Sequence, residues 1–333
     1  MSIRTVLSLA TLAGLGLSLA ASAQETPEPG QIVDTFEKLG GVHKGLRRNH
    51  SKGSCAVGSF VGTADAKKLS SSALFSGKSV PVIGRFSVAG PNPAVPDNAR
   101  APHGLALQFK LPKDELQQTA MLNVPIFPVS TVQGFYESLL INLPDPATGK
   151  PDPARGPAFG AAHPEAKPFM EYMGSHNASA TYTEATYRSL SAYKFVNGKT
   201  ETWVRWRFEP AAGEKFLTDA EAAAPPHDFL DQALAESTRK GGAKWTMVAI
   251  IGEPDKGDSI KDPSAPWPAG RKEVKLGTLT LTKGGKDAAG QCEDINFDPN
   301  VASAGIEPSA DDQILQYRSS AYAESFSRRQ NEK

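Results

Sequence analysis

The chain has 333 residues, of which 39% are hydrophobic and 22% are charged, and its formal net charge is +0. This composition is typical of a soluble globular protein, long enough for one large domain or two small ones. The balanced charge gives no indication of a nucleic acid or an anionic membrane as a partner.

The first residues have the pattern of a cleaved export signal. Arg4 precedes an uncharged, Leu- and Ala-rich run from Val6 to Ala20, and Ala21-Ser22-Ala23 is a cleavage site of the small-x-small type. The alternative is an uncleaved membrane anchor, but the apolar run is short for a membrane span. We therefore predict a signal peptide over 1–23, a mature chain that begins at Gln24, and a periplasmic location.

Helical and strand patterns follow the leader in chain order. Strand-like runs in the first half share alternating or continuous apolar residues and cover 54–63, 80–89 and 105–111. Helices are expected over 32–39 and from Ser130, which can cap its helix, to about Leu140. The Pro-, Gly- and Ala-rich stretch 145–164 is predicted to be a surface excursion.

In the second half, strand patterns return at 182–195, 203–208, 244–251 and 274–282. A helical pattern covers 218–240 with a break at Pro225-Pro226, and a last helix opens at Ser309 and reaches about Arg329, with Asp311 and Asp312 in its first turn. Long-range antiparallel pairing fits these elements better than β-α-β units. We predict an α+β fold in which an antiparallel β-barrel carries attached helices.

The sequence contains two cysteines, Cys55 and Cys292. In an oxidising compartment they could form a disulfide, and two buried free thiols are an equal alternative. No C-x-x-C-H segment is present, which excludes a covalently attached c-type haem, and no H-E-x-x-H segment indicates zinc.

Three residues of the last predicted helix fall on one stripe. Arg318, Tyr322 and Arg329 are at offsets i, i+4 and i+11. This spacing places a guanidinium one turn from a phenol, and a fixed cation favours the phenolate, an anionic oxygen ligand that suits ferric iron. An Arg–Tyr pair at this spacing is more often a packing contact, so the stripe alone is weak support for a haem site.

A histidine near the predicted mature N-terminus provides a second signal. Arg47 and His50 belong to the segment Leu46-Arg47-Arg48-Asn49-His50-Ser51-Lys52-Gly53, and Cys55-Ala56-Val57-Gly58 follows it. The segment resembles the distal haem motif of the catalase family, R-x-x-H-x-K-G.

Further segments resemble that family in the same order along the chain. They are Arg85-Phe86-Ser87 with Val88-Ala89-Gly90, Arg100-Ala101-Pro102-His103-Gly104-Leu105-Ala106, Pro125-Ile126-Phe127, and Phe297-Asp298-Pro299 through Gly305-Ile306-Glu307-Pro308-Ser309 to Leu315, Arg318 and Tyr322. The matches run from about residue 36 to residue 329. The resemblance therefore implies a catalase-like haem-binding domain over 24–333, with the haem between the barrel and the last helix.

The resemblance also implies a role for each matched side chain. His50 is implied as the distal base that moves a proton between the two peroxide oxygens, and Ser87 as the residue that orients its ring. Tyr322 is implied as the axial iron ligand, kept as phenolate by Arg318, and Phe135 as an aromatic that stacks on the haem. The implied propionate-binding residues are Arg47, Arg85 and Arg329. The implied cofactor is a non-covalent haem, with haem b as the default.

Several positions depart from the family pattern. Ala101 stands where the access channel of the family carries an aspartate, and Leu122 stands at the distal asparagine position, with Asn123 as its neighbour. Ala323 and Glu324 replace the usual Pro-Asp after the tyrosine. The loss of the channel charge and of the distal amide is expected to weaken the capture of a second peroxide, the step that distinguishes a catalase from a peroxidase.

The sequence is therefore similar to the small exported peroxidases of the catalase family. We predict a haem-dependent peroxidase that reduces hydrogen peroxide or organic hydroperoxides with an external electron donor and has weak catalase activity. Two alternatives stay open: a related reaction on fatty-acid hydroperoxides, and a periplasmic haem-binding or haem-storage protein without turnover. A sugar- or peptide-binding protein has no motif in its support. We expect a monomer or small homo-oligomer that binds neither nucleic acid nor membrane.

Overall fold

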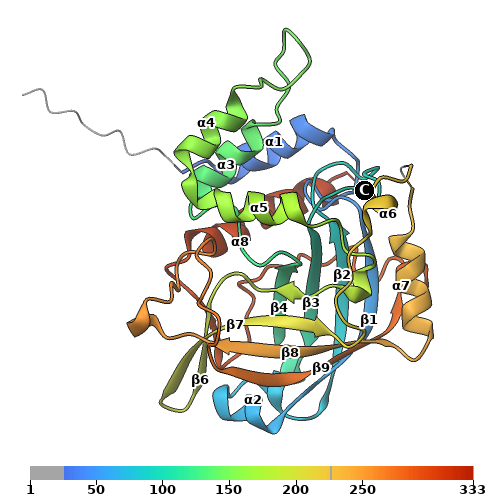
Figure 1. The fold of residues 1–333 in the computed structure, drawn as a ribbon. Coiled ribbons are helices and arrows are strands. Elements are labelled where there is room, and N and C mark those ends of the chain that lie inside the picture. The colour runs from blue at the N-terminus through green and yellow to red at the C-terminus, as the bar shows by residue number, and fades with distance from the viewer. Residues whose placement is uncertain (1–25, 226, 333) are drawn as a thin grey trace, which may run out of the picture.

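The computed structural model describes residues 26–225 and 227–332 (Figure 1). The predicted signal peptide over 1–23, the predicted mature N-terminus at Gln24, and Pro226 of the predicted helix break lie outside the described residues. Within the described part of the chain, no helix is both long enough and apolar enough to span a membrane.

The strands form one antiparallel sheet in the order β10-β6-β7-β5-β4-β3-β2-β1-β9-β8, and an additional pairing of β7 with β8 closes it into a barrel. Their bounds are β1 Gly53–Gly62, β2 Ser79–Val88, β3 His103–Lys110, β4 Leu116–Leu122, β5 Tyr187–Arg188, β6 Tyr193–Asn197, β7 Thr200–Pro210, β8 Ala243–Ile251, β9 Glu273–Gly284 and β10 Ile306–Pro308. The antiparallel barrel confirms the predicted fold class. Closure also removes the exposed edges that an open sheet would present.

The interior of the barrel is filled by large side chains. Along β2 and β3 the alternating residues Phe86, Leu105, Leu107 and Phe109 are buried in one core cluster, which also holds Trp206 and Trp245 of the opposite strands. Because successive side chains of a strand point to opposite faces, the residues between them face outward. The barrel is thus a packed core, and any ligand site on these strands lies on the outer wall.

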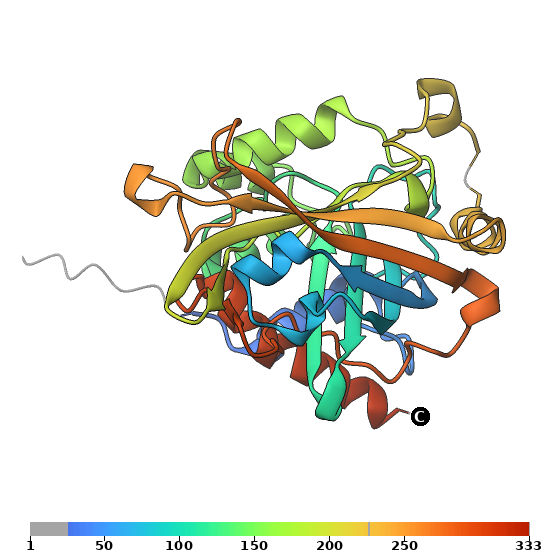
Figure 2. The same ribbon diagram turned by 90° about the horizontal axis from the view of Figure 1, so that it is seen from below.

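The helices gather mainly over one end and one outer wall of the barrel (Figure 1). Their bounds are α1 Pro29–Gly40, α2 Ala64–Leu69, α3 Val132–Leu140, α4 Arg155–Ala162, α5 Lys167–Ser175, α6 Asp219–Ala222, α7 Leu230–Arg239 and α8 Gln313–Gln330. The helices α1, α3, α4, α5 and α8 lie together, α2 lies at the opposite end, and α7 lies beside the barrel (Figure 1). Seen from below, α8 (red) runs beside the green strands of the first half (Figure 2).

Two helix starts differ from the sequence prediction. The cap of α3 is Thr131 rather than Ser130, since the Thr131 side chain accepts from the Gly134 backbone. The last helix begins at Gln313, because the carboxylate of Asp312 caps it by accepting from the Leu315 backbone. Ser309 therefore precedes the helix and does not open it, and Asp312 is its cap and not part of its first turn. An Asp at such a cap satisfies one of the free N–H groups and favours the positive end of the helix.

Three further regions were predicted incompletely. The stretch 145–164 contains the whole of α4 and leads towards α5, so it is not only an irregular excursion. The region 182–195 is a 3-10 turn followed by the short strands β5 and β6, and the strand β4 was not predicted at all. In β4 the sequence Leu116-Gln117-Gln118-Thr119 carries polar side chains on both faces, which hides the period-two pattern.

Candidate active site

A cavity of about 340 Å³ lies between α8 and the outer wall formed by β2, β3 and β4. All of the site residues predicted from the sequence line it: Arg47, His50, Arg85, Ser87, Phe135, Arg318, Tyr322 and Arg329. They come from the segment before β1, from β2, from α3 and from α8. Arg47 and Arg329, which are 282 positions apart in the chain, are thus brought to one place.

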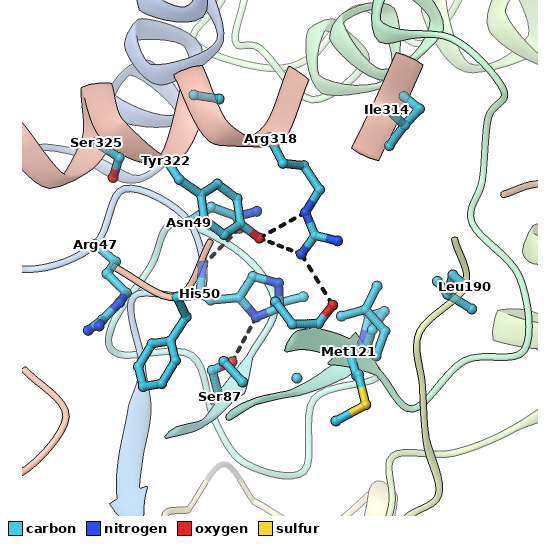
Figure 3. Close-up of a pocket in the computed structure, with 18 of the residues that line it drawn as sticks. Arg47, Asn49, His50, Ser87, Met121, Leu190, Ile314, Arg318, Tyr322 and Ser325 are labelled. Carbon is cyan, nitrogen blue, oxygen red and sulfur yellow. Dashed lines mark hydrogen bonds between the residues drawn. The ribbon is translucent and has the colours of Figure 1, made fainter. Parts of the chain in front are cut away.

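His50 projects into this cavity from a turn with an unusual backbone. Its φ is 53°, in the left-handed region that non-glycine residues seldom occupy. The Asn49 side chain stabilises the turn, because its Oδ1 accepts from the His50 backbone at 2.9 Å and from the Gly90 backbone at 3.1 Å. The His50 Nδ1 and the Ser87 Oγ are 2.9 Å apart (Figure 3). Backbone strain that is held in place by several contacts often marks a functional residue.

The wall strand β3 makes room for the imidazole of His50. A Cβ at Gly104 would lie 2.7 Å from Ser87 Oγ and 3.2 Å from His50 Nδ1, so any larger residue would push the ring or its partner away. The glycine therefore fixes the depth at which the ring can sit.

The imidazole of His50 is neutral at neutral pH. Desolvation within the protein, together with the positive charges of Arg85 and Arg318, lowers the pKa of His50 to about 3. In the tautomer with the proton on Nδ1, that nitrogen donates to Ser87 Oγ and Nε2 carries a free lone pair. Nε2 makes no hydrogen bond within 26–225 and 227–332, so this nitrogen is available as a base.

Tyr322 reaches into the cavity from α8, with Arg318 one turn before it (Figure 3). The phenol oxygen of Tyr322 accepts from Arg318 Nη2 at 2.6 Å and from Nε at 3.2 Å. Nη2 also donates to the Ala120 carbonyl of β4 at 3.3 Å, which joins the pair to the barrel wall. Burial would lower the pKa of Arg318, but its interactions with Tyr322, Tyr193 and Asp312 together outweigh this and raise it. The guanidinium thus stays charged and stabilises negative charge on the phenol oxygen.

Three further arginines concentrate positive charge at the cavity. Desolvation, together with the nearby charges of Arg85 and Arg329, lowers the pKa of Arg47 to about 8. Burial lowers the pKa of Arg85 to about 10 and also lowers that of Arg329. None of the three makes an ion pair with a carboxylate in the described part of the chain. Uncompensated guanidinium groups at a cavity are the arrangement that binds a carboxylate ligand.

A short loop joins two of these arginines. Arg47 donates to the carbonyls of Cys292 at 3.2 Å and Ile295 at 2.9 Å, and Arg329 donates to the Ile295 carbonyl at 3.2 Å and to the Glu293 carbonyl. The structure resolves the alternative that the sequence left open, because Cys292 forms a disulfide with Cys55 of β1. This loop accepts hydrogen bonds from arginines on both sides of the cavity, and the disulfide attaches it to the barrel.

The remaining walls fit a flat apolar group. Phe135 of α3 lines the cavity and packs against Phe127, with ring centroids 5.7 Å apart. The barrel wall presents only small side chains at Gly104, Ala106 and Ala120. The cavity thus combines an apolar wall with a phenol oxygen next to Arg318, an imidazole and a cluster of arginines, and this set of residues fits a haem with its carboxylate groups.

The comparisons with known proteins agree with this arrangement. The family described as "Catalase" matches residues 43–332. A catalase-related peroxidase of Synechococcus elongatus is 46% identical over 97% of this chain and 95% of its own length. The chain belongs to the catalase family. A second catalase-related peroxidase, from Mycolicibacterium paratuberculosis, is 30% identical over 89% of this chain and 93% of its own length.

Full-length catalases are similar over a smaller share of their own length. The catalase of Pseudomonas aeruginosa is 30% identical over 83% of this chain and 55% of its own length. The solved structure of catalase A from Saccharomyces cerevisiae superimposes with a TM-score of 0.78 at 25% identity and covers 86% of this chain and 62% of that one. The chain therefore spans 55% of the length of the first of these catalases and 62% of the second.

The departures from the catalase family pattern have visible consequences in the cavity. Leu122 lines the cavity, whereas Asn123 does not. The Asn123 side chain instead accepts from the His103 backbone at 2.7 Å and donates to Ser179 Oγ at 3.0 Å, so it stabilises the loops behind the wall. Ala101 is likewise absent from the cavity lining. The cavity is thus lined by the apolar side chain of Leu122 and not by the amide of Asn123.

Several cavity residues were missed by the sequence analysis. Asn49 and Gly104 lie inside the quoted motifs, but their roles depend on contacts between different segments of the chain. Gly104 alone had a sequence signal, because a glycine inside a strand often marks a close approach of other groups. Arg48 is buried and pairs with Glu37 of α1 at 2.7 Å, so it anchors the His50 segment and is not a surface charge. Arg188 of β5 lines the cavity and has no counterpart among the quoted motifs.

Proposed function

We propose that this chain is a haem-dependent peroxidase that reduces hydrogen peroxide or organic hydroperoxides with an external electron donor. Its membership of the catalase family and its similarity to catalase-related peroxidases over almost the whole chain support this function. The observation that carries the proposal is the His50 imidazole: its Nε2 has no hydrogen-bond partner among the described residues, and it shares the cavity with a phenol paired with Arg318.

Each side chain then has a defined task. Tyr322 would hold the iron through its phenol oxygen, and Arg318 would keep that oxygen anionic. Arg47, Arg85 and Arg329 would bind the haem propionates by paired N–H donors. Phe135 would pack against the porphyrin. The haem is proposed to be non-covalent haem b, and when bound it supplies the iron that exchanges electrons with the peroxide.

The protein itself moves the protons of the reaction. His50 Nε2 takes a proton from one oxygen of the peroxide and returns it to the other, which then leaves as water or alcohol. Ser87 keeps the ring in the tautomer that leaves Nε2 free. A haem-storage protein would need Tyr322 and the arginines but not this base, and the strained turn that presents His50 therefore favours catalysis.

We propose that an electron donor completes the turnover and that disproportionation of peroxide is slow. Support comes from Leu122, because an apolar side chain at the distal wall cannot hydrogen-bond a second peroxide. The test is to supply the haem-loaded protein with hydrogen peroxide and an aromatic donor and to record oxygen release and donor oxidation together. We expect donor oxidation to dominate. Oxygen release as fast as that of full-length catalases, without donor oxidation, would overturn the proposal.

We also propose that the protein is exported and that its mature form begins at Gln24. The sequence pattern of residues 1–23 supports export, and a buried disulfide fits an oxidising compartment. The mass of the protein recovered from the periplasm of an expressing bacterium tests this. An unprocessed chain confined to the cytoplasm would contradict it.

A further inference from the structure

One row of the barrel wall carries a cation on the distal side of the cavity. The strand register pairs Ser87 of β2 with Gly104, Gly104 with Leu122, and Leu122 with Arg188. Directly paired residues of an antiparallel sheet point to the same face, and neighbouring strands are about 4.8 Å apart. Arg188 therefore lies in the same row as Ser87 and Gly104, which contact the His50 ring, and its backbone is about 10 Å from that of Gly104.

The guanidinium of Arg188 is only partly used by the protein. Its Nη1 donates to the carbonyls of Asn123 at 3.2 Å and Thr186 at 3.1 Å. Glu214 is the acid beside it, and its carboxylate is 3.9 Å from the same Nη1, too far for a hydrogen bond. Nε and Nη2 make no hydrogen bond within the described ranges, and burial lowers the pKa of Arg188. Nε and Nη2 of this cavity-lining side chain are therefore available as donors.

The next residue of the row shows what a fully paired arginine looks like in this sheet. Arg207 of β7 pairs with Arg188 in the register but does not line the cavity. All of its nitrogens are used, since it donates to Glu209 at 2.7 Å and to Glu273 at 2.9 and 2.7 Å. Two arginines at equivalent positions thus differ in one respect: the one in the cavity lacks a strong carboxylate partner.

Two leucines lie beside Arg188 in the cavity lining, to which the two serines flanking Leu190 also belong. Leu122 lies between it and Gly104 in the row, and Leu190 follows two residues later and also lines the cavity. The φ of Leu190 is 58°, a left-handed backbone that is strained for a bulky residue. The fold therefore stabilises an unfavourable turn two residues after this partly paired guanidinium, as is common where a ligand binds.

We propose that Arg188 is an anion subsite that binds the carboxylate of an amphipathic organic substrate, whose apolar body lies over Leu122 and whose reacting end faces His50. The inference rests on the proposed peroxidase function and specifies its substrate class. The carboxylate can belong to the hydroperoxide or to the electron donor, and both share the same recognition chemistry. Such a ligand spans about 10 Å between its charge and its reacting group, the distance between strands two intervals apart.

Equilibrium binding tests the subsite without turnover. The probe is 4-propylbenzoate, with its methyl ester as the uncharged partner, titrated into haem-loaded protein by calorimetry so that the propionates occupy Arg47, Arg85 and Arg329. We expect the carboxylate to bind about tenfold or more tightly than the ester, and Arg188→Met to remove this preference, because a charge-assisted hydrogen bond is lost. Arg207→Met is the matched control and should keep it. Equal affinity for acid and ester in the unaltered protein would overturn the proposal, whatever the variants do.

Steady-state kinetics identify which substrate carries the charge and separate recognition from a structural role. One arm compares cumene hydroperoxide with its 4-carboxylated form, and the other compares a phenolic donor with its carboxylated form. Arg188→Met should raise KM about tenfold for the charged member of one pair, and Arg188→Lys should restore part of the loss. An equal fall with hydrogen peroxide and a neutral donor would show that Arg188 only positions the wall, and would overturn the proposal. If no peroxide is consumed at all, the proposed function fails, while the calorimetry still decides on Arg188.

Discussion

The two sides of the cavity are built in different ways. Tyr322 and Arg318 lie on one continuous helix, and their contact follows from a spacing of four residues. His50 lies on a left-handed turn whose position depends on Asn49, Ser87 and Gly104, which come from three segments of the chain. The helix side is thus set by local geometry and the turn side by tertiary contacts. Substitutions on the turn side should therefore disturb function through small displacements.

The largest effect is expected when the base itself is removed. His50→Ala should lower peroxide consumption by about 10²–10⁴-fold, because no other histidine of the described chain lines the cavity, while the haem stays bound by α8 and the arginines. Rapid mixing with peroxide and the visible spectrum measure the two properties together. His227→Ala, at an exposed histidine, is the control and should change neither. Loss of the haem along with the activity would mean that the two sides of the cavity are not independent.

A smaller effect should follow from crowding the ring of His50. In Gly104→Ala the new Cβ would lie within 3.2 Å of the imidazole and 2.7 Å of Ser87 Oγ, so the ring must shift. We expect peroxide consumption to fall about tenfold to hundredfold, since a displacement of about 1 Å is enough for such a loss. The control is Gly160→Ala on α4, where a Cβ meets no atom within 4 Å. Unchanged kinetics in Gly104→Ala would show that the turn side tolerates movement.

The disulfide connects the two sides and should affect both. Replacing Cys55 and Cys292 by Ala frees the loop whose carbonyls hold Arg47 and Arg329. We expect a loss of about 2–5 kcal/mol in the free energy of unfolding and weaker retention of haem. Denaturant unfolding measures the first, and transfer of haem to an excess of a haem-binding acceptor measures the second. Haem transfer at the rate of the unaltered protein would show that the loop does not position the arginines.

The same contrast between local geometry and tertiary contacts explains how much of this site could be predicted from the sequence. The stripe of Arg318 and Tyr322 was visible from helical spacing alone, and the His50 motif was recognisable by resemblance. Asn49, Gly104 and Arg188 act through contacts or register between distant segments, which no local pattern records. The strand β4 was missed because its polar residues hide the alternation, and with it the pairing that places Arg188 in the cavity.

The smallest effect concerns the opposite face of the same wall. His103 is completely buried beside Tyr182, neither of its ring nitrogens has a hydrogen-bond partner in the described structure, and burial lowers its pKa to about 4. Between about pH 6.5 and pH 4 the unfolded chain binds a proton at this histidine and the folded protein does not. Lowering the pH across this range therefore lowers the free energy of unfolding by about 1.4 kcal/mol per pH unit. His103→Leu should remove this loss. Thermal unfolding at pH 7 and pH 5 measures it, and an equal pH dependence in both proteins would contradict the assignment.

The central claim is that the Tyr322 phenol oxygen holds a ferric haem iron. The most direct test is the visible and electron paramagnetic resonance spectrum of the haem-loaded protein beside that of Tyr322→Phe, with Tyr317→Phe on the same helix as the control. We predict high-spin ferric haem with phenolate charge-transfer bands in the unaltered protein and in Tyr317→Phe, and the loss of these bands or of the haem in Tyr322→Phe. Identical spectra for all three proteins, or no haem uptake by the unaltered protein, would contradict the account.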